Sequence, residues 1–454
     1  FHKAHQAVYT DAAMAASGGD WMITGVSLRS ADVADAMNPQ NGLYTLLTRG
    51  PEGVSARVIG SIVRVLVAPR EPDAVLAALA APETKIVSLT ITEKGYGIDP
   101  KTGGLDRAHP SIAPDLANPR QPAGAVGFLV EGLRLRRQRG LPPYTVLCCD
   151  NLPHNGRVLR RLVLDFAAAG DPDLAAYIEA QVRFPSTMVD RITPASTTQT
   201  FADVAALTGR DDRAAVETEP FTQWVIEDDF TAGRPDWAAG GAIFAADVGP
   251  YEKMKLRMLN GAHSMLAYAG YIAGHAHVRD VMGDAALAKL VARHMQAAAA
   301  TLDPVPGVDL DAYATDLRSR FANPAIAHQT YQIAMDGTQK LPQRLIEPAM
   351  EALRRGQSLD AYAFAVAAWM RYCLGMNESG ETYLLRDPRE AEIGALLDGS
   401  GRDAGSIVDR LLGLPGLFPD ELATAPEWRA GIRRRLETML AQNMRAAIER
   451  DAAR

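Results

Sequence analysis

Apolar and polar positions along the first half of the chain predict strands and helices in turn. Short apolar runs with the length of buried strands occupy residues 21–28 (WMITGVSL), 84–92 (TKIVSLTIT) and 144–151 (YTVLCCDN). Amphipathic runs over 125–140 and 157–170 predict helices, and the first ends in basic residues and a glycine, as helix C-termini do. This repetition predicts right-handed βαβ units and a mostly parallel sheet, in which function gathers at the carboxyl ends of the strands.

From about residue 250 the pattern changes to long helical segments rich in Ala, Leu and Met, which predict a mainly helical second domain. One of these segments, residues 253–270 (KMKLRMLNGAHSMLAYAG), is apolar along much of its length. It nevertheless contains Lys255, Asn260 and His263. These three polar groups of different chemistry are either part of a solvated face or directed toward one reacting atom.

The spacing of these side chains argues against a solvated face. On an ideal helix with about 100° per residue, Glu252, Lys255, Asn260 and His263 fall within an arc of roughly 140° that also holds three leucines. Two interpretations remain open. The helix either faces the core, with its Asn and His bonded to local backbone groups, or it forms one wall of a cleft.

Polar residues also lie at the ends of two of these apolar runs and at a third apolar-to-polar boundary, in MVDRITP, where parallel strands would end. They are Thr92, Glu93 and Lys94; Asp150, Asn151, His154 and Asn155; and Asp190 with Arg191. Each group alone is typical of a cap or a turn. Together with the Lys/Asn/His helix they suit carbonyl chemistry, because a buried lysine with a lowered pKa can exchange a proton with an alcohol or ketone near neutral pH. Two asparagine amides can hold the developing alkoxide, and a histidine can hydrogen-bond a neighbouring hydroxyl.

Composition narrows the classes of protein. The 454 residues suffice for two or three domains, and the net charge of −7 argues against a nucleic-acid partner. Cys148 and Cys149, adjacent in an apolar run, are typical of buried thiols in a reducing compartment. We see neither a signal peptide nor an apolar run of about 18 residues, so we expect a cytoplasmic protein with no membrane partner. His275 and His277 have no third ligand nearby in sequence, so we expect no metal.

Ordered motifs along essentially the whole chain resemble those of the polyol-specific long-chain dehydrogenases, which include mannitol 2-dehydrogenases and fructuronate reductases (D-mannonate oxidoreductases). The motifs are FHKAHQAVYTD, SLTITEKGY, CCDNLPHNG, FPSTMVDRITP, PYEKMKLRMLNGAHS and HQTYQIAMDGTQKLPQR. The resemblance implies a metal-independent, nicotinamide-dependent oxidoreductase with an α/β fold. A Rossmann-type domain with a mostly parallel sheet would occupy residues 1–247 and a mainly α-helical substrate domain residues 248–454, with the active site between them. Members of this family are often monomers, so we expect a monomer or a weak homo-oligomer.

The resemblance also implies roles for individual residues. Lys255 matches the general acid/base, Asn151 and Asn260 the pair that hydrogen-bonds the reacting oxygen, and His263 a substrate-orienting residue. Glu252 matches a carboxylate in proton relay to the lysine, and Asp190 a polar residue lining the substrate site. The expected cofactor-binding residues are Phe1, His2, Val26, Ser27, Arg29, Thr92, Glu93 and Lys94.

Two departures from the family pattern concern the cofactor. The Gly-rich loop of a dinucleotide site is expected upstream of Phe1, so that Phe1 and His2 open the helix whose N-terminus faces the pyrophosphate. At the end of the 21–28 run, Leu28, Arg29 and Ser30 stand where an acidic residue commonly binds the ribose hydroxyls of NAD. Arg29 either accommodates a 2′-phosphate or stacks on adenine. NAD is the expected cofactor and NADP the alternative.

The substrate is predicted to be a sugar acid. Lys340 and Arg344 lie four residues apart, hence near one another on a helix, and an arginine suits a carboxylate. The alternative is a pair of surface cations. Residues 328–376 resemble the fructuronate reductase branch, so we expect reduction of D-fructuronate to D-mannonate, with oxidation of D-mannitol to D-fructose as the second candidate. A third candidate, of another class, is a catalytically inactive sugar- or nucleotide-binding protein, against which the retained site residues argue.

Overall fold

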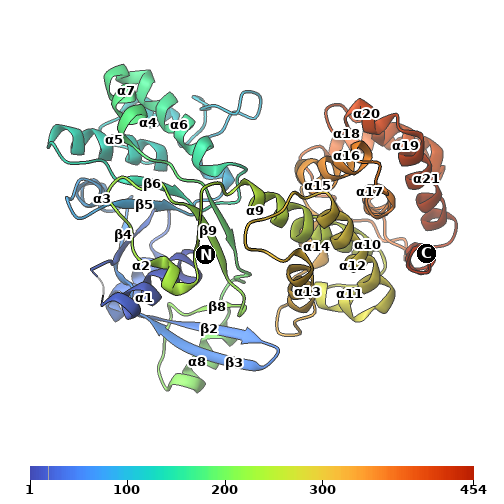
Figure 1. Cartoon of the computed structure of the whole chain (residues 1–454), viewed down its shortest axis with the longest axis horizontal. Coiled ribbons are helices and arrows are strands. Elements are labelled where there is room, and N and C mark those ends of the chain that lie inside the picture. Colours follow the sequence, from blue (N-terminus) through green and yellow to red (C-terminus); the bar gives the residue numbers. More distant parts are fainter. Residues whose placement is uncertain (19) are drawn as a thin grey trace. The chain divides into compact units, whose positions relative to one another are not determined.

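The computed structural model describes residues 1–18 and 20–454, which form two compact units, Phe1–Gly249 and Pro250–Arg454 (Figure 1). The sequence predicts a Rossmann-type domain at residues 1–247 and a helical domain at residues 248–454, and these domain limits remain a prediction.

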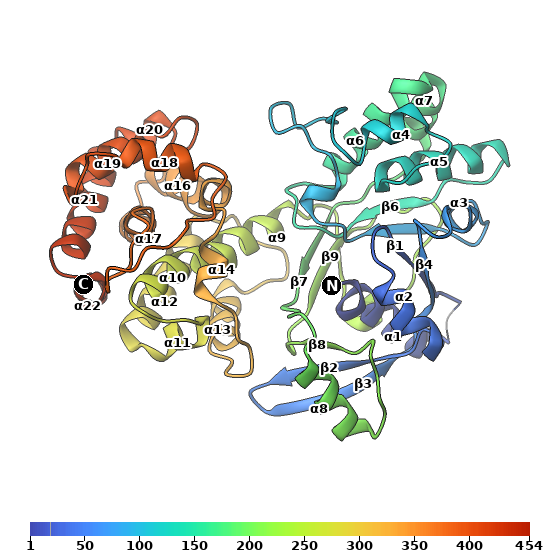
Figure 2. The ribbon, with the colours of Figure 1, turned by 180° about the vertical axis from the view of Figure 1, so that it is seen from behind.

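The first unit contains the predicted mostly parallel sheet, in which hydrogen bonds join the strands in three separate groups (Figure 2). Its strands are β1 (Ile23–Ser27), β4 (Ile62–Val67), β5 (Ile86–Leu89), β6 (Thr145–Cys148), β7 (Thr187–Asp190), β9 (Gln223–Glu227) and β10 (Ile243–Ala245). The pairs β1–β4, β5–β6 and β9–β10 are parallel, whereas β7 runs antiparallel to β9. The strands predicted near residues 21–28, 84–92 and 144–151 are therefore confirmed.

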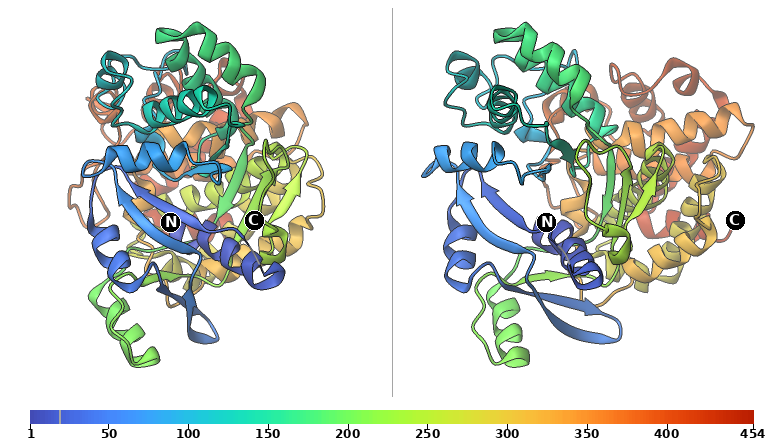
Figure 3. Two further views of the ribbon diagram at one scale, coloured as in Figure 1. Left: turned by 90° about the vertical axis from the view of Figure 1, so that its left-hand side faces the viewer. Right: turned by 60° about the vertical axis from the view of Figure 1, so that its left-hand side comes forward.

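Helices cover both faces of this sheet. They are α1 (Gln6–Ser17), α2 (Asp32–Met37), α3 (Pro72–Leu79), α4 (Ala113–Ala117), α5 (Ala125–Gln138), α6 (Asn155–Gly170) and α7 (Pro172–Gln181). Val146 and Cys148 of β6 pack in one cluster with α5 and α6, which are coloured teal in Figure 3. Leu147 and Cys149 pack in another cluster, with α1 and β9. Because successive side chains of a strand point to opposite faces, the continuous apolar run VLCC fits a strand that is buried on both sides. The cysteines are buried free thiols, as predicted.

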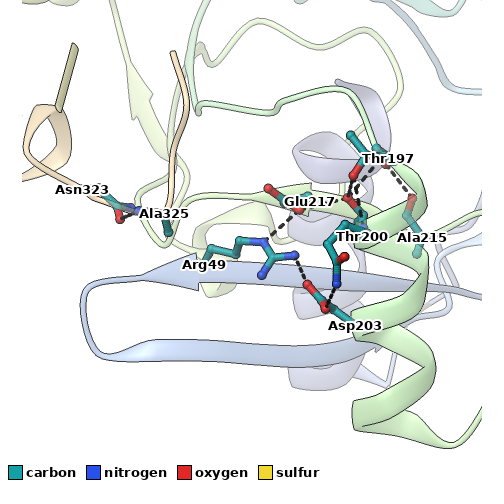
Figure 4. A network of polar contacts seen from close by, with 10 residues as sticks. Arg49, Thr197, Thr200, Asp203, Ala215, Glu217, Asn323 and Ala325 are labelled. Atoms are coloured by element: carbon teal, nitrogen blue, oxygen red, sulfur yellow. Dashed lines mark hydrogen bonds and ion pairs between the residues drawn. The ribbon is translucent and has the colours of Figure 1, made fainter. Parts of the chain in front are cut away.

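The first unit also contains a three-stranded sheet that we did not predict from the sequence. Strand β2 (Tyr44–Gly50) pairs antiparallel with β3 (Gly53–Ile59) and parallel with β8 (Val216–Thr218). Arg49 fastens this sheet to helix α8 (Thr198–Thr208): its guanidinium group contacts Asp203 at 2.5 Å and Glu217 at 2.9 Å (Figure 4). The fork of the guanidinium suits two carboxylates at once, so this arginine sets the position of the sheet on the helix.

The second unit is helical, as predicted. Its longer helices are α10 (Gly261–Ile272), α12 (Ala285–Ala300), α13 (Leu310–Phe321), α16 (Glu347–Arg354), α17 (Asp360–Tyr372), α19 (Ala404–Leu412), α21 (Pro426–Ala441) and α22 (Met444–Ala452). The other helices are α11 (Val278–Gly283), α14 (Thr330–Ala334), α15 (Gly337–Leu341), α18 (Glu390–Leu397) and α20 (Asp420–Ala423), and α9 (Gly249–Met254) spans the division between the units. Helices α10 and α17 are buried almost all round and pack on each other, which makes them the core of the unit.

The predicted helix over residues 253–270 is interrupted by a π-helical segment, η5 (Lys255–Asn260), which leads into α10. A second π-helical segment, η6 (Pro342–Ile346), packs against it. The wider turn of a π-helix rotates every later side chain relative to an ideal α-helix. The arc predicted from 100° per residue therefore does not describe this segment, in which Lys255 and Asn260 lie in η5, Glu252 lies in α9 before it and His263 in α10 after it.

No helix in the described part of the chain is both long and apolar enough to cross a membrane.

Candidate active site

Glu252, Lys255, Asn260 and His263, the four polar residues singled out in the sequence, are buried or half-buried. Lys255 opens η5 with only 9% of its surface exposed, and His263 in α10 is 7% exposed. Glu252 in α9 and Asn260 at the end of η5 are half-buried. These values exclude a solvated face and show that the lysine lies in desolvated surroundings.

His263 lies in an aromatic and cationic environment. Its ring stacks on Phe321, with 4.3 Å between centroids, and meets the ring of His328 edge-on at 5.4 Å. Burial lowers the pKa of His263 well below 6.5, and the charges of His328, Arg344 and Arg320 lower it further. The imidazole is thus neutral at physiological pH, and its buried Nε2 has no hydrogen-bond partner among the described residues. A neutral ring can accept or donate one hydrogen bond to a hydroxyl group.

The two predicted substrate cations have different surroundings. Arg344 lies in η6 and donates from Nη1 to the hydroxyl of Ser264 at 3.3 Å. Lys340 lies in α15 and donates to the carbonyl oxygens of Ile333 at 3.2 Å and Met335 at 2.6 Å. Lys340 therefore caps the end of α14, a role that its sequence spacing did not predict. Its charge also contributes, after burial, to a lowered pKa of His328.

The close approach of the two π-helical segments depends on Gly261. A Cβ atom at this position would lie 2.8 Å from the carbonyl oxygen of Arg344 and 3.0 Å from Nε2 of His294. His294 in α12 is 1% exposed, and burial lowers its pKa to about 4. We did not single out this histidine from the sequence, because it stands in an unremarkable Ala-rich helix.

In the first unit, Asp150 joins the ends of β5 and β6. Its carboxylate accepts hydrogen bonds from the backbone N–H of Ile91 at 2.9 Å and of Thr92 at 3.1 Å. The hydroxyl of Tyr96 donates to the same carboxylate at 2.7 Å. Thr92 has a φ of 66°, a backbone conformation that β-branched residues rarely adopt. Asn151, the next residue after Asp150, is exposed.

Asn155 joins the ends of β6 and β7. Its amide nitrogen donates to the carbonyl oxygens of Asp150 at 3.0 Å and Thr187 at 2.8 Å, and its oxygen accepts from the Thr187 N–H at 2.9 Å. Asp190, at the end of β7, is buried. At Gly156 a Cβ would lie 2.3 Å from the carbonyl oxygen of Phe184, so a glycine is required for this approach. The carboxyl ends of β5 and β6, which carry predicted site residues, are thus bonded to each other through Asp150, and Asn155 ties the end of β6 to the first residue of β7.

The remaining predicted cofactor residues lie near the ends of β1 and β5. Ser27 ends β1, Val26 and Arg29 are exposed there, and Glu93 and Lys94 are exposed in the turn η3 (Glu93–Gly95) after β5. Phe1 stacks on His5 with 5.0 Å between centroids, and Nε2 of His2 lies 3.5 Å from the hydroxyl of Ser88 in β5. The carboxyl ends of β1 and β5, each of which is parallel to its own partner strand, therefore offer largely exposed surroundings with polar side chains, which suit a dinucleotide.

In the part of the chain that the structure describes, no group of three or more His, Cys, Asp or Glu side chains is arranged to hold a metal ion. His275 instead lies 3.6 Å from the carboxylate of Asp284, and His277 lies 3.1 Å from that of Asp280.

A mostly parallel sheet with polar strand ends, followed by a helical unit with a buried lysine and a neutral histidine, defines a Rossmann-type oxidoreductase of two units. Comparison with known proteins gives the family. Family models described as the mannitol dehydrogenase Rossmann domain and the mannitol dehydrogenase C-terminal domain match residues 1–239 and 247–440. The chain belongs to the mannitol dehydrogenase family, whose members are oxidoreductases that act on secondary alcohols.

Relatives and solved structures of several substrate specificities resemble the chain. The D-mannonate oxidoreductase of Escherichia coli (strain K12) is 47% identical over 430 residues, which cover 93% of this chain and 87% of that protein. The structure of Pseudomonas fluorescens mannitol 2-dehydrogenase in ternary complex with NAD and D-mannitol is 40% identical, covers 99% of this chain and 92% of its own, and has a TM-score of 0.84. A D-sorbitol dehydrogenase in substrate-free form is 35% identical, covers 99% of this chain and 93% of its own, and has a TM-score of 0.91.

Proposed function

We propose that this protein reduces the keto-uronate D-fructuronate to D-mannonate with NADH. The observation that carries this proposal is the set of cations around the buried His263 and the half-buried His328. The charges of Arg344 and Arg320 contribute to the lowered pKa of His263, and the charge of Lys340 contributes to the lowered pKa of His328. Such a cluster of positive charge around neutral rings favours an anionic substrate group. The 47% identity to a D-mannonate oxidoreductase supports the same choice.

In this mechanism the side chains of the protein handle the oxygen and its proton. The carboxamides of Asn151 and Asn260 donate hydrogen bonds to the C2 carbonyl oxygen. This oxygen becomes an alkoxide when the C2 carbon accepts a hydride. The ammonium of Lys255 then donates a proton to that oxygen, and Glu252 relays a proton back to the lysine. NADH, when bound at the strand ends of the first unit, supplies the hydride. His263 accepts or donates a hydrogen bond to a neighbouring hydroxyl, and Asp190 lines the substrate site.

The first test is NADH oxidation by the full-length protein with D-fructuronate, D-fructose and other keto-sugars, with NADPH in parallel because Arg29 leaves the cofactor choice open. Lys255→Met should lower kcat by about 10²–10⁴-fold, since it removes a general acid. The matched control is Lys289→Met, because Lys289 is an exposed lysine of α12. Equal turnover in both variants would remove Lys255 from the chemistry. A wild-type protein that turns over no keto-sugar would favour the inactive binding protein.

The second test concerns the carboxylate. Arg344→Ala should raise KM for D-fructuronate by about 10–100-fold, the value of a charge-assisted hydrogen bond, and change KM for D-fructose far less. Arg354→Ala is the control, since Arg354 is an exposed arginine whose ion pair with Glu421 lies on the surface of α16 and α20. Small, equal effects of Arg344→Ala on both substrates would eliminate the carboxylate argument.

Oxidation of D-mannitol to D-fructose is the second candidate. One observation favours it: the ammonium of Lys340 is bonded to the carbonyl oxygens of Ile333 and Met335. A lysine whose ammonium is bonded to backbone carbonyl oxygens contributes less to the binding of a substrate carboxylate than an arginine that donates hydrogen bonds to that carboxylate. The same substrate panel distinguishes the two candidates.

A further inference from the structure

We propose that Asp150 is a positioning residue for the reaction, because its carboxylate fixes the position of the turn after β5 relative to Asn151. We call this turn, residues 91–96, the cofactor-side turn. This inference rests on the proposed function, which places NADH at the strand ends where Thr92, Glu93 and Lys94 are the expected cofactor residues, and which assigns Asn151 to the reacting oxygen. Asp150 itself is assigned no contact with either.

The turn after β5 depends on this carboxylate for its conformation. Oδ2 accepts from the N–H of Ile91 at 2.9 Å and from the hydroxyl of Tyr96 at 2.7 Å, and Oδ1 accepts from the N–H of Thr92 at 3.1 Å. Thr92 has a φ of 66° and a ψ of 159°. A β-branched residue keeps such a conformation only where surrounding bonds over-determine it, and these bonds lie on both sides of the Thr92 nitrogen. The positions of Glu93 and Lys94 follow from that of Thr92, since they continue the same turn.

The backbone that carries Asp150 is held from the opposite side. Asn155 donates to the carbonyl oxygen of Asp150 at 3.0 Å and pairs with both backbone groups of Thr187 in β7. The side chain of Asp150 is thus bonded to the turn after β5, its main-chain carbonyl is held by Asn155, which in turn is bonded to the start of β7, and Asn151 follows directly. A displacement of the Asp150 carboxylate would therefore change the distance between the cofactor-side turn and the Asn151 amide.

A carboxamide at position 150 cannot replace the carboxylate. An asparagine has the same shape but directs an NH₂ donor toward at least one of the three donors that the carboxylate now accepts. Two donors that face each other repel, so the turn has to move. Tyr96→Phe is the milder perturbation, because it removes one of the three bonds and no volume from the buried ring.

Asp115 offers a matched control in the same unit. It is 1% exposed and accepts backbone N–H groups of Ala123 and Gly124, each at 2.8 Å, before helix α5. Asp115→Asn therefore disrupts the same type of buried carboxylate–backbone interaction at a place that bears no predicted site residue.

The experiment measures NADH Kd by fluorescence, kcat and KM with the best keto-sugar, and Tm, for the full-length wild type, Asp150→Asn, Tyr96→Phe and Asp115→Asn. We expect Asp150→Asn to raise the NADH Kd by about tenfold and to lower kcat by about 10–100-fold, since misplacements of about 1 Å have effects of this size. Tyr96→Phe should change both quantities in the same direction by less. Asp115→Asn should lower Tm but leave Kd and kcat within about twofold of the wild type.

Two other outcomes are informative. If Asp150→Asn and Tyr96→Phe lower Tm as Asp115→Asn does while Kd and kcat are retained, Asp150 is purely structural and the inference is overturned. If Asp150→Asn does not fold, unchanged Kd and kcat in Tyr96→Phe overturn it equally. A wild type that neither binds NADH nor reduces any keto-sugar contradicts the proposed function itself, which separates the two failures.

Discussion

At the scale of single residues, burial controls the chemistry of this protein more than sequence neighbours do. Three histidines of the second unit, His263, His294 and His328, have lowered pKa values, and in each case burial is the main cause. Lys255 is similarly withdrawn from water. We recognised Lys255 and His263 from the sequence through their polar chemistry on an apolar helix, but His294 and His328 gave no such signal.

His294 should make the stability of the protein depend on pH. Its pKa is about 4 in the folded state and 6.5 ordinarily, so the unfolded state binds the proton more readily between these values. Stability is then complete above about pH 6.5 and declines by about 3 kcal/mol as pH falls toward 4. His294→Gln should reduce this pH dependence by a similar amount, as measured by urea unfolding at several pH values. A variant whose stability falls as steeply as that of the wild type would contradict the assignment.

At the scale of elements, the two π-helical segments decide where the site residues point. η5 carries Lys255 and Asn260, η6 carries Arg344, and the two segments pack together across Gly261. An ideal α-helical wheel misplaces residues after Lys255 because each π-helical residue advances by a smaller angle. The local sequence has no proline or glycine within η5 that would reveal this change.

Gly261→Ala tests this packing. The added methyl group would lie 2.8 Å from the carbonyl oxygen of Arg344, so the segments must separate. We expect a loss of stability of about 1–3 kcal/mol by chemical denaturation, together with a lower kcat. Gly394→Ala is the control, because a Cβ at Gly394 in α18 meets no atom within 4 Å and should be neutral or stabilise by up to about 1 kcal/mol. Equal effects of both changes would show that the two segments tolerate separation.

At the scale of the whole molecule, the two units divide the proposed work. The first unit carries the strand ends assigned to the dinucleotide, and the second carries the lysine, the histidines and the cations assigned to the sugar. The oligomeric state expected from the sequence stays a prediction.

Binding of NADH should therefore slow amide hydrogen exchange to different extents in the two units. At about one hundred times its Kd, NADH stabilises the protein by about 2.7 kcal/mol. Hydrogen exchange with mass spectrometry should show slower exchange in residues 86–96 and 145–156, and little change in α21 of the second unit. Protection confined to the second unit would place the cofactor elsewhere than we propose.

The sequence by itself determined the class of fold, because apolar periodicity is a local property that survives any arrangement of the elements. It also determined the family, since ordered motifs identify it, and it predicted the residues of the candidate site. Tertiary structure alone decided the surroundings of those groups: the desolvation of His263, the engagement of Lys340 by carbonyl oxygens, the π-helical register after Lys255 and the bracing of the β5 turn by Asp150. Each of these depends on atoms brought together by packing, such as the carboxylate of Asp150 and the backbone of Ile91, and no local pattern of residues specifies such pairs.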